Sequence, residues 1–222
     1  EALIAFKTQL SDPHNVLRTW NETSADPCGG CDLGSNSLSG ELSPELANLT
    51  NLERLVLYNN SITGGIPEEF GTGLTSLTYL DLSRNLLNGT LQESFYNLMK
   101  LVTLNLSKNA IFDSIKDEIG NFTNLVNLDL SINAFYGEIP ESLGQLSNLA
   151  ILCDRRLSDN VFEGPISANF INLPKLDVLD LSENNLNGTL PEWNGKQREM
   201  TSMCGFERKP LFGRLMHKCD MR

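Results

Sequence analysis

Leucines and isoleucines recur along this chain at short intervals, separated by polar residues in a fixed rhythm. The stretch from 74 to 97 reads LTSLTYLDLSRNLLNGTLQESFYN and contains one full cycle. Leu77, Leu80 and Leu82 lie at inward positions, and Leu80 and Leu82 alternate with Tyr79 and Asp81, as expected for a short strand with one buried face. We therefore expect each cycle to contain a strand with Tyr79, Asp81 and Ser83 exposed, followed by a turn and an outward helical turn.

An asparagine marks the same place in every cycle. The pattern L-x-x-N-x-L/I/F-x-G places it at seven positions with spacings of 24, 25, 24, 24, 27 and 24: Asn36, Asn60, Asn85, Asn109, Asn133, Asn160 and Asn184. This periodicity is typical of leucine-rich repeats. It predicts an α/β repeat solenoid of seven repeats, in which parallel strands stack roughly 4.8 Å apart into a curved sheet of about 30 Å on the concave face.

The residue types in each turn can be explained by what the backbone of the turn requires. An asparagine amide has donors and an acceptor, so it can satisfy backbone groups that a turn leaves unpaired in the interior. Gly65-Ile66-Pro67, Glu138-Ile139-Pro140 and Thr189-Leu190-Pro191 follow in their repeats. Glycine permits a tight turn, and proline fixes extended backbone that needs no donor.

A solenoid must cover its two ends. We predict an N-terminal cap over residues 1–31, repeats over 32–195, and a C-terminal cap with a basic tail over 196–222. In the first segment, Leu3, Phe6 and Leu10 share one face of a helix that ends at Asp12-Pro13, and Val16, Leu17 and Trp20 extend the apolar cover.

The cysteines raise a separate question, because Cys28 and Cys31 enclose two glycines in DPCGGCDLG. No x-x-L-x-x-L stretch precedes Leu33, which favours a shortened structural cap with roughly fifteen to twenty residues missing against the 24-residue period. A redox pair and a zinc site are the alternatives; a redox pair requires a helix start on a βαβ scaffold, and zinc requires four ligands. Cys204 and Cys219 are candidates for a loop-closing disulfide, although sequence leaves the connectivity open. Cys153 is left over, in a Cys153-Asp154-Arg155 insertion that lengthens one repeat.

The net charge restricts the expected classes of partner, and the glycosylation sequons indicate where the protein is located. The net charge is −11, and the tail from 196 carries +4, which leaves −15 on the rest. An acidic surface repels nucleic acid and anionic membranes, so we expect neither as a partner. No run of eighteen apolar residues occurs and the start lacks a signal-peptide pattern, so the chain is expected to be a mature or excised segment without membrane contact of its own. Seven N-x-S/T sequons, together with paired cysteines, favour the secretory pathway and an extracellular, cell-surface or apoplastic location: Asn21, Asn48, Asn59, Asn88, Asn105, Asn121 and Asn187.

The L-x-G-x-I-P variant of the repeat resembles the plant extracellular class. The stretches LDLGSNSLSGELSPELANLTNLERLVLYNNSITGGIPEEF and LDVLDLSENNLNGTLPEWNGK are similar to the ectodomain of somatic embryogenesis receptor-like kinases. The segment ending at Cys28 looks like the N-terminal cap of plant receptor kinases, and Cys204 with Cys219 resembles their C-terminal cap pair. The resemblance implies a co-receptor that joins a larger, ligand-bound receptor. Three features depart from that family: seven repeats replace five, the ligand-contacting stretch of the cap is missing, and the linker, membrane helix and kinase are absent.

Side chains that flank the inward leucines are expected to form a ladder on the concave sheet, where a protein or peptide would bind. Tyr58 matches the tyrosine in that family's LYxN motif and is the first candidate, because tyrosine offers a large contact area and a hydroxyl at low entropic cost. Arg156 is the second. The alternative for each position is an ordinary solvated strand residue, and Asp81, Asp129 and Asp180 could equally cap backbone turns. The full set of predicted contact residues is Arg54, Val56, Tyr58, Tyr79, Asp81, Asn105, Asp129, Arg156 and Asp180.

Three functions are compatible with this fold in different degrees. The first is a recognition module in signalling or defence, namely the ligand-binding or co-receptor ectodomain of a plant receptor-like kinase or receptor-like protein. The second is a soluble cell-wall inhibitor similar to polygalacturonase-inhibiting proteins. The third, catalysis, is disfavoured because the only histidines are His14 and His217 and no carboxylate pair has an evident pKa-splitting pocket. We expect no cofactor and no metal.

Overall fold

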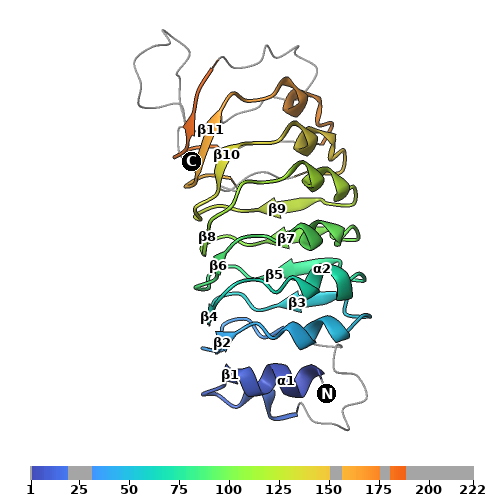
Figure 1. Ribbon diagram of the computed structural model, residues 1–222, viewed down its shortest axis with the longest axis vertical. Coiled ribbons are helices and arrows are strands. Elements are labelled where there is room, and N and C mark those ends of the chain that lie inside the picture. The colour runs from blue at the N-terminus through green and yellow to red at the C-terminus, as the bar shows by residue number, and fades with distance from the viewer. Residues whose placement is uncertain (1, 20–31, 151–156, 176–180, 189–222) are drawn as a thin grey trace, which may run out of the picture.

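The computed structural model describes residues 2–19, 32–150, 157–175 and 181–188, and in this part of the chain the repeats stack along one long axis (Figure 1). Four strands form a parallel sheet in the order β3-β5-β7-β9. The strands are β3 (Arg54–Val56), β5 (Tyr79–Asp81), β7 (Thr103–Asn105) and β9 (Asn127–Asp129). This is the predicted concave sheet, and it is called so below. The first repeat joins it through a single bridge between Asp32 and Val56.

A second line of short strands runs along one edge of the solenoid, on the left in Figure 1. We call it the lateral sheet, and the sequence pattern gave no indication of it. It has three parts, β1-β2-β4, β6-β8 and β10-β11-β12, and all pairs except β1 with β2 are parallel. Its repeat strands are β2 (Ser39–Glu41), β4 (Ser61–Thr63), β6 (Asn88–Gly89), β8 (Ala110–Ile111), β10 (Tyr136–Glu138), β11 (Val161–Gly164) and β12 (Asn185–Leu186).

Short helical turns return the chain on the opposite side, as the sequence predicted. They are η2 (Pro44–Asn48), α2 (Glu69–Gly73), η3 (Glu93–Asn97), η4 (Asp117–Asn121), η5 (Glu141–Gln145) and η6 (Ala168–Asn172). Each directs at least one apolar residue inward, such as Phe70, Phe95 and Ile119. The leucines of the strands and the residues of these turns together form one continuous hydrophobic core.

The N-terminal cap closes one end of this core. Helix α1 (Ala2–Gln9) buries Leu3 and Phe6, and β1 (Leu10–Ser11) pairs antiparallel with β2. The helix ends three residues before the predicted stop, because Leu10 enters this strand. A 3-10 turn, η1 (Val16–Thr19), begins where the Asp12 carboxylate accepts hydrogen bonds from the backbone N–H groups of Val16 and Leu17, at 2.9 and 2.8 Å.

The repeat asparagines perform the predicted role. Asn85 is 6% exposed; its Nδ2 donates to the carbonyls of Leu57 and Leu82, and its Oδ1 accepts from the Ile62 N–H. The same pattern, with one amide serving two neighbouring repeats, is found at Asn60, Asn109, Asn133, Asn160 and Asn184. The ladder therefore satisfies buried backbone groups and locks each repeat to the preceding one.

Several predictions lie outside the described residues. These are the cysteine pairs Cys28 with Cys31 and Cys204 with Cys219, the leftover Cys153, the sequon at Asn21, and the contact candidates Arg156 and Asp180. The boundaries 1–31, 32–195 and 196–222 stay predictions.

Candidate partner-binding face

The concave sheet brings most of the predicted contact residues onto one face. Its register aligns Arg54, Tyr79, Thr103 and Asn127 in one row. Val56, Asp81, Asn105 and Asp129 form the next row. Neighbouring members of a row come from adjacent repeats roughly 4.8 Å apart, so side chains from four repeats are presented to one ligand.

Aromatic residues dominate the N-terminal part of this face. The guanidinium carbon of Arg54 lies 4.0 Å from the centroid of the Tyr79 ring, within the range of a cation–π interaction. Tyr58 is 37% exposed, and its ring lies against Gly34, where an added Cβ would come within 2.1 Å of Cε1. Both side chains are thus held in place before any partner arrives, which lowers the entropy lost on binding.

In the later strands of the concave sheet, polar side chains form hydrogen bonds with the turn that directly follows their own strand. Asp81 Oδ1 accepts from the N–H and Oγ of Ser83, at 3.0 and 2.7 Å. Asn105 and Asp129 bond in the same way to Ser107 and Ser131. The acidic residues therefore cap turns, as the alternative interpretation held, while their side chains stay half-buried on the face.

Two expectations about exposure are wrong. Ser83, Ser107 and Ser131 are 3–6% exposed, because their hydroxyls turn back to the preceding Asp or Asn. Val56 is only 4% exposed, so it offers a partner little surface. This short side chain lies between Arg54 and Tyr58 on its strand, with the bridge to Asp32 on one side and the pair with Asp81 on the other.

A groove of about 440 Å³ lies where the middle strands end. It is lined by Ser83, Arg84, Asn105, Ser107, Lys108, Asp129, Ser131 and Ile132. Arg84 and Lys108 were not among the predicted contact residues, although both directly precede a repeat asparagine and so share one register position. Both are exposed, have a left-handed backbone with φ of 55° and 57°, and form no ion pair among the described residues. The groove therefore carries two positive charges from adjacent repeats, together with the carboxylate of Asp129.

The sequons are distributed unevenly over the surface. Asn48 and Asn121 end the outward turns η2 and η4, as predicted, and are exposed. Asn59, Asn88 and Asn187 are exposed as well. Asn105 alone among these six is half-buried, and it lines the groove.

Within the described residues, no group of three or more His, Cys, Asp or Glu side chains is arranged to hold a metal ion. No helix in this part of the chain is both long and apolar enough to cross a membrane. The face is built from aromatic, basic, acidic and amide side chains.

Family profiles agree with this architecture. The leucine rich repeat profile matches residues 32–87, 50–111 and 75–135, and a further leucine rich repeat profile matches 175–196. The leucine rich repeat N-terminal domain matches residues 1–30. The chain belongs to the leucine-rich repeat proteins, and its relatives are the ectodomains of plant receptor kinases.

Two curated relatives come from Arabidopsis thaliana. Leucine-rich repeat receptor-like protein kinase PXC2 is 39% identical over 103 residues, which is 40% of this chain and 10% of the relative. Protein MALE DISCOVERER 2 is 39% identical over 85 residues, covering 32% of this chain and 12% of the relative. The chain thus spans about a tenth of the length of these relatives.

Solved ectodomains from the same plant superpose well. The GASSHO1/SCHENGEN3 receptor kinase, in complex with CASPARIAN STRIP INTEGRITY FACTOR 2, matches with a TM-score of 0.76 and 32% identity over 85% of this chain and 24% of its own. HAESA, in complex with the peptide hormone IDA and the co-receptor SERK1, matches with a TM-score of 0.66 and 31% identity over 86% of this chain and 38% of its own.

Proposed function

We propose that this chain is an extracellular recognition module of a plant leucine-rich repeat receptor kinase or receptor-like protein, facing the cell surface or apoplast, and that its concave face holds a protein or peptide partner. The observation that carries the proposal is the row of prepositioned side chains, with Arg54 stacked on Tyr79 and Tyr58 lying on Gly34. Large, rigid aromatic and arginine side chains are those that most often dominate binding energy.

The solved relatives support this proposal over a cell-wall enzyme inhibitor, because GASSHO1/SCHENGEN3 is in complex with CASPARIAN STRIP INTEGRITY FACTOR 2 and HAESA with a peptide hormone and a co-receptor. No catalytic role is proposed for this segment. The finer proposal of a co-receptor of the somatic embryogenesis type rests on the repeat motifs, whereas a ligand-binding receptor role rests on the likeness to GASSHO1 and HAESA.

The charged residues of the groove indicate which chemical groups a partner would carry. Arg84 and Lys108 come from adjacent repeats and form no ion pair within the described chain. Like charges side by side are unfavourable on a sheet. We infer that a partner places an acidic group near this pair while its apolar part contacts Tyr58 and Tyr79.

Surface plasmon resonance against a panel of secreted plant peptides and receptor ectodomains tests the proposal. A receptor binds a peptide by itself, whereas a co-receptor binds only the complex of a peptide and its receptor. Tyr58→Ala or Arg54→Ala should weaken the positive interaction by about tenfold or more, which corresponds to about 1.4 kcal/mol.

Gly34→Ala provides an independent test of the contact made by Tyr58. Its added methyl group would displace the Tyr58 ring without removing any contact residue. It should reproduce the loss seen in Tyr58→Ala, while Glu69→Ala on the exposed part of α2 should bind normally. Full binding by both Tyr58→Ala and Arg54→Ala would show that the partner uses another surface.

A further inference from the structure

The lateral sheet carries a patch of exposed apolar side chains in its middle. Leu86, Phe112, Tyr136 and Val161 are 58%, 51%, 49% and 55% exposed. Ala110 and Ala134 complete the set at equivalent positions. We call these six residues the lateral apolar patch; they come from the four repeats that contain Asn85, Asn109, Asn133 and Asn160.

The patch is continuous because its strands are neighbours. Strands β6 and β8 pair directly, and Tyr136 of β10 is paired with Val161 of β11. Between these two pairs the Ala134 N–H donates to the Ile111 carbonyl at 2.8 Å, and the Tyr136 N–H donates to Asp113 at 2.9 Å. Four adjacent strands span roughly 15 Å, and the exposed Glu138 at the end of β10, paired with Glu163 of β11, borders the patch.

The ends of the same sheet are polar. Ser61 and Thr63 occupy the corresponding outward positions in the preceding repeat, and Asn185 and Asn187 occupy them in the last. An apolar patch with a polar and charged rim, here including Glu138 and Glu163, is the composition of a protein interface. Exposed aromatic and branched side chains gathered in this way on a chain of net charge −11 indicate a covered surface.

We propose that the lateral apolar patch pairs two copies of this chain face to face, in opposite directions. The argument is the order of the residues. Along one outward column it reads Leu86, Ala110, Ala134, Val161, and in the other the aromatic residues Phe112 and Tyr136 lie at the centre. A two-fold axis perpendicular to the long axis of the stack, midway between the repeats of Asn109 and Asn133, places Leu86 opposite the partner's Val161, alanine opposite alanine, and Phe112 opposite the partner's Tyr136.

The polar and charged residues at the two ends of the patch favour the same antiparallel arrangement of the two copies. Asn88 and Glu163 occupy the aromatic column at the two ends of the patch, and the antiparallel order places Glu163 opposite the partner's Asn88. No like charges meet, and the amide can donate to the carboxylate. Two copies running in the same direction would instead press Glu163 against the partner's Val161 and desolvate a charge without a partner.

The size of the lateral apolar patch limits the affinity of the proposed dimer. A standard stable interface buries about 800 Å² and about 20–30 residues per partner, and the six residues of the lateral apolar patch form a smaller surface. We therefore expect a reversible dimer with a dissociation constant on the order of 10–100 μM. The concave face stays open in this dimer, so this proposal does not depend on the proposed function.

Sedimentation velocity of the secreted protein, from about 1 to 300 μM, tests the proposal. We expect a monomer–dimer equilibrium. Leu86→Lys and Val161→Glu should each weaken it at least tenfold, and an equimolar mixture of the two variants should pair better than either alone, because lysine then faces glutamate across the axis. Met99→Glu is the matched control, since Met99 is 50% exposed but lies outside the patch.

Four outcomes would overturn the proposal. They are a monomer at every concentration, dimerisation unaffected by both charged variants, a mixture that pairs no better than the single variants, and occupancy of the Asn88 sequon by glycan in the same preparation. Thermal melts of each variant check that it is folded. No loss of fold is expected, because both substituted side chains are more than half exposed.

Discussion

At the scale of single residues, the repeat asparagine is the most consequential side chain of the molecule. Asn109 Nδ2 lies 2.9–3.3 Å from the carbonyls of Leu82, Leu106 and Ser107, and its Oδ1 lies 3.0 Å from the Leu87 N–H. Its contacts reach the preceding repeat as well as its own. Loss of one amide therefore weakens a repeat and its attachment to the neighbour together.

Asn109→Leu should lower the free energy of unfolding by about 1–3 kcal/mol, because it leaves buried backbone groups without a partner. Urea unfolding followed by circular dichroism measures the change. Asn97→Leu is the control, since Asn97 is exposed and its side chain forms no hydrogen bond with the described part of the chain. Equal stability of the two variants would contradict the role assigned to the ladder.

Ile132 is a strained residue at an otherwise polar position. It has a left-handed backbone with φ of 54°, as do the residues that precede the other repeat asparagines, Ser35, Asn59, Arg84, Lys108, Asp159 and Glu183. A β-branched side chain is unfavourable in this conformation. Ile132→Asn should therefore raise stability by about 1 kcal/mol. Ile132→Val keeps the branch and should give no gain; a gain from valine would show that strain is not the cause.

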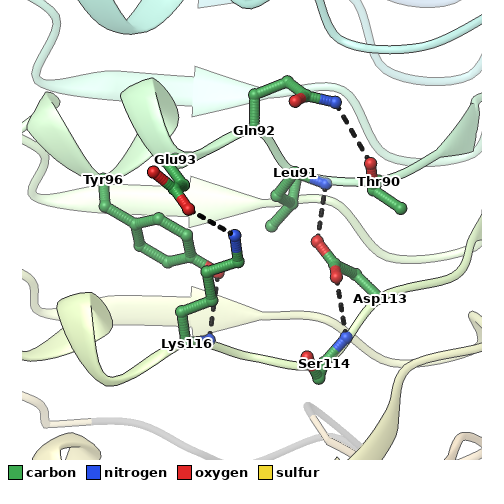
Figure 2. A network of polar contacts seen from close by, with 8 residues as sticks. All are labelled: Thr90, Leu91, Gln92, Glu93, Tyr96, Asp113, Ser114 and Lys116. Carbon is green, nitrogen blue, oxygen red and sulfur yellow. Dashed lines mark hydrogen bonds and ion pairs between the residues drawn. The ribbon is translucent and has the colours of Figure 1, made fainter.

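At the scale of elements, Asp113 replaces a glycine and changes the lateral sheet. The equivalent positions hold Gly40, Gly64, Gly89, Gly137, Gly164 and Gly188, all with φ between 75° and 122°. Asp113 is 6% exposed, and its carboxylate accepts from the N–H groups of Leu91 and Ser114, each at 2.8 Å (Figure 2). Regular strand pairing ends here, and β8 is connected to β10 by the Ala134 N–H to Ile111 and Tyr136 N–H to Asp113 carbonyl bonds and by an isolated bridge between Ser114 and Tyr136.

Asp113→Ala should cost about 2 kcal/mol of stability, because two backbone donors lose their acceptor at once. Chemical denaturation midpoints measure this, with Asp117→Ala as the control on the exposed start of η4. If Asp113→Ala is as stable as the control, water satisfies these donors and the carboxylate is not a structural bridge.

Tyr96 supports the same connection from the helical side. It is 1% exposed, stacks on Phe122 at 6.0 Å, and its hydroxyl accepts from the Lys116 N–H at 3.2 Å (Figure 2). Burial raises the pKa of Tyr96 to about 12. The folded state thus keeps the phenol neutral at pH values where the unfolded chain, whose tyrosine pKa is about 10, has already lost the proton.

This pKa shift predicts a loss of stability in alkali. Below pH 10 the stabilising effect is complete, and between pH 10 and 12 it is lost at up to about 1.4 kcal/mol per pH unit as the unfolded state is favoured. Tyr96→Phe should remove this part of the slope in urea midpoints from pH 9 to 12, whereas Tyr136→Phe, at a 49% exposed tyrosine, should keep it. Parallel slopes for wild type and Tyr96→Phe would contradict the assignment.

The sequence predicted those elements whose residues repeat a pattern several times. Leu80 and Leu82 are fully buried at their predicted positions, and Arg54 and Tyr79 lie on the predicted face. The lateral sheet was missed because a strand such as Asn88–Gly89 is too short for alternation to appear. Arg84 and Lys108 were missed because a turn residue does not reveal the direction of its side chain; the signal was their common place before the asparagine.

At the scale of the whole molecule, the repeat separates two surfaces. The concave sheet and the lateral sheet lie on different sides of one stack (Figure 1), although they are close in sequence: β3 ends at Val56 and β4 begins at Ser61. Tyr58 and Leu86 are both exposed, so Tyr58→Ala and Leu86→Lys should each leave the backbone of the other surface unchanged. Partner binding and self-association can therefore be measured independently.

The sequons connect this geometry to a final prediction. Asn105 lies in the row between Asp81 and Asp129 and lines the groove, so a glycan there would fill the surface that a partner needs. We expect Asn48 and Asn121 to be glycosylated in protein secreted from plant cells, and Asn105 to be free, as mass spectrometry of tryptic peptides can measure. Ser107→Ala removes the Asn105 sequon and should leave partner binding unchanged. If Asn105 is occupied and Ser107→Ala increases binding, the glycan limits access to the concave face; if it is occupied and binding is unaffected, the partner binds elsewhere.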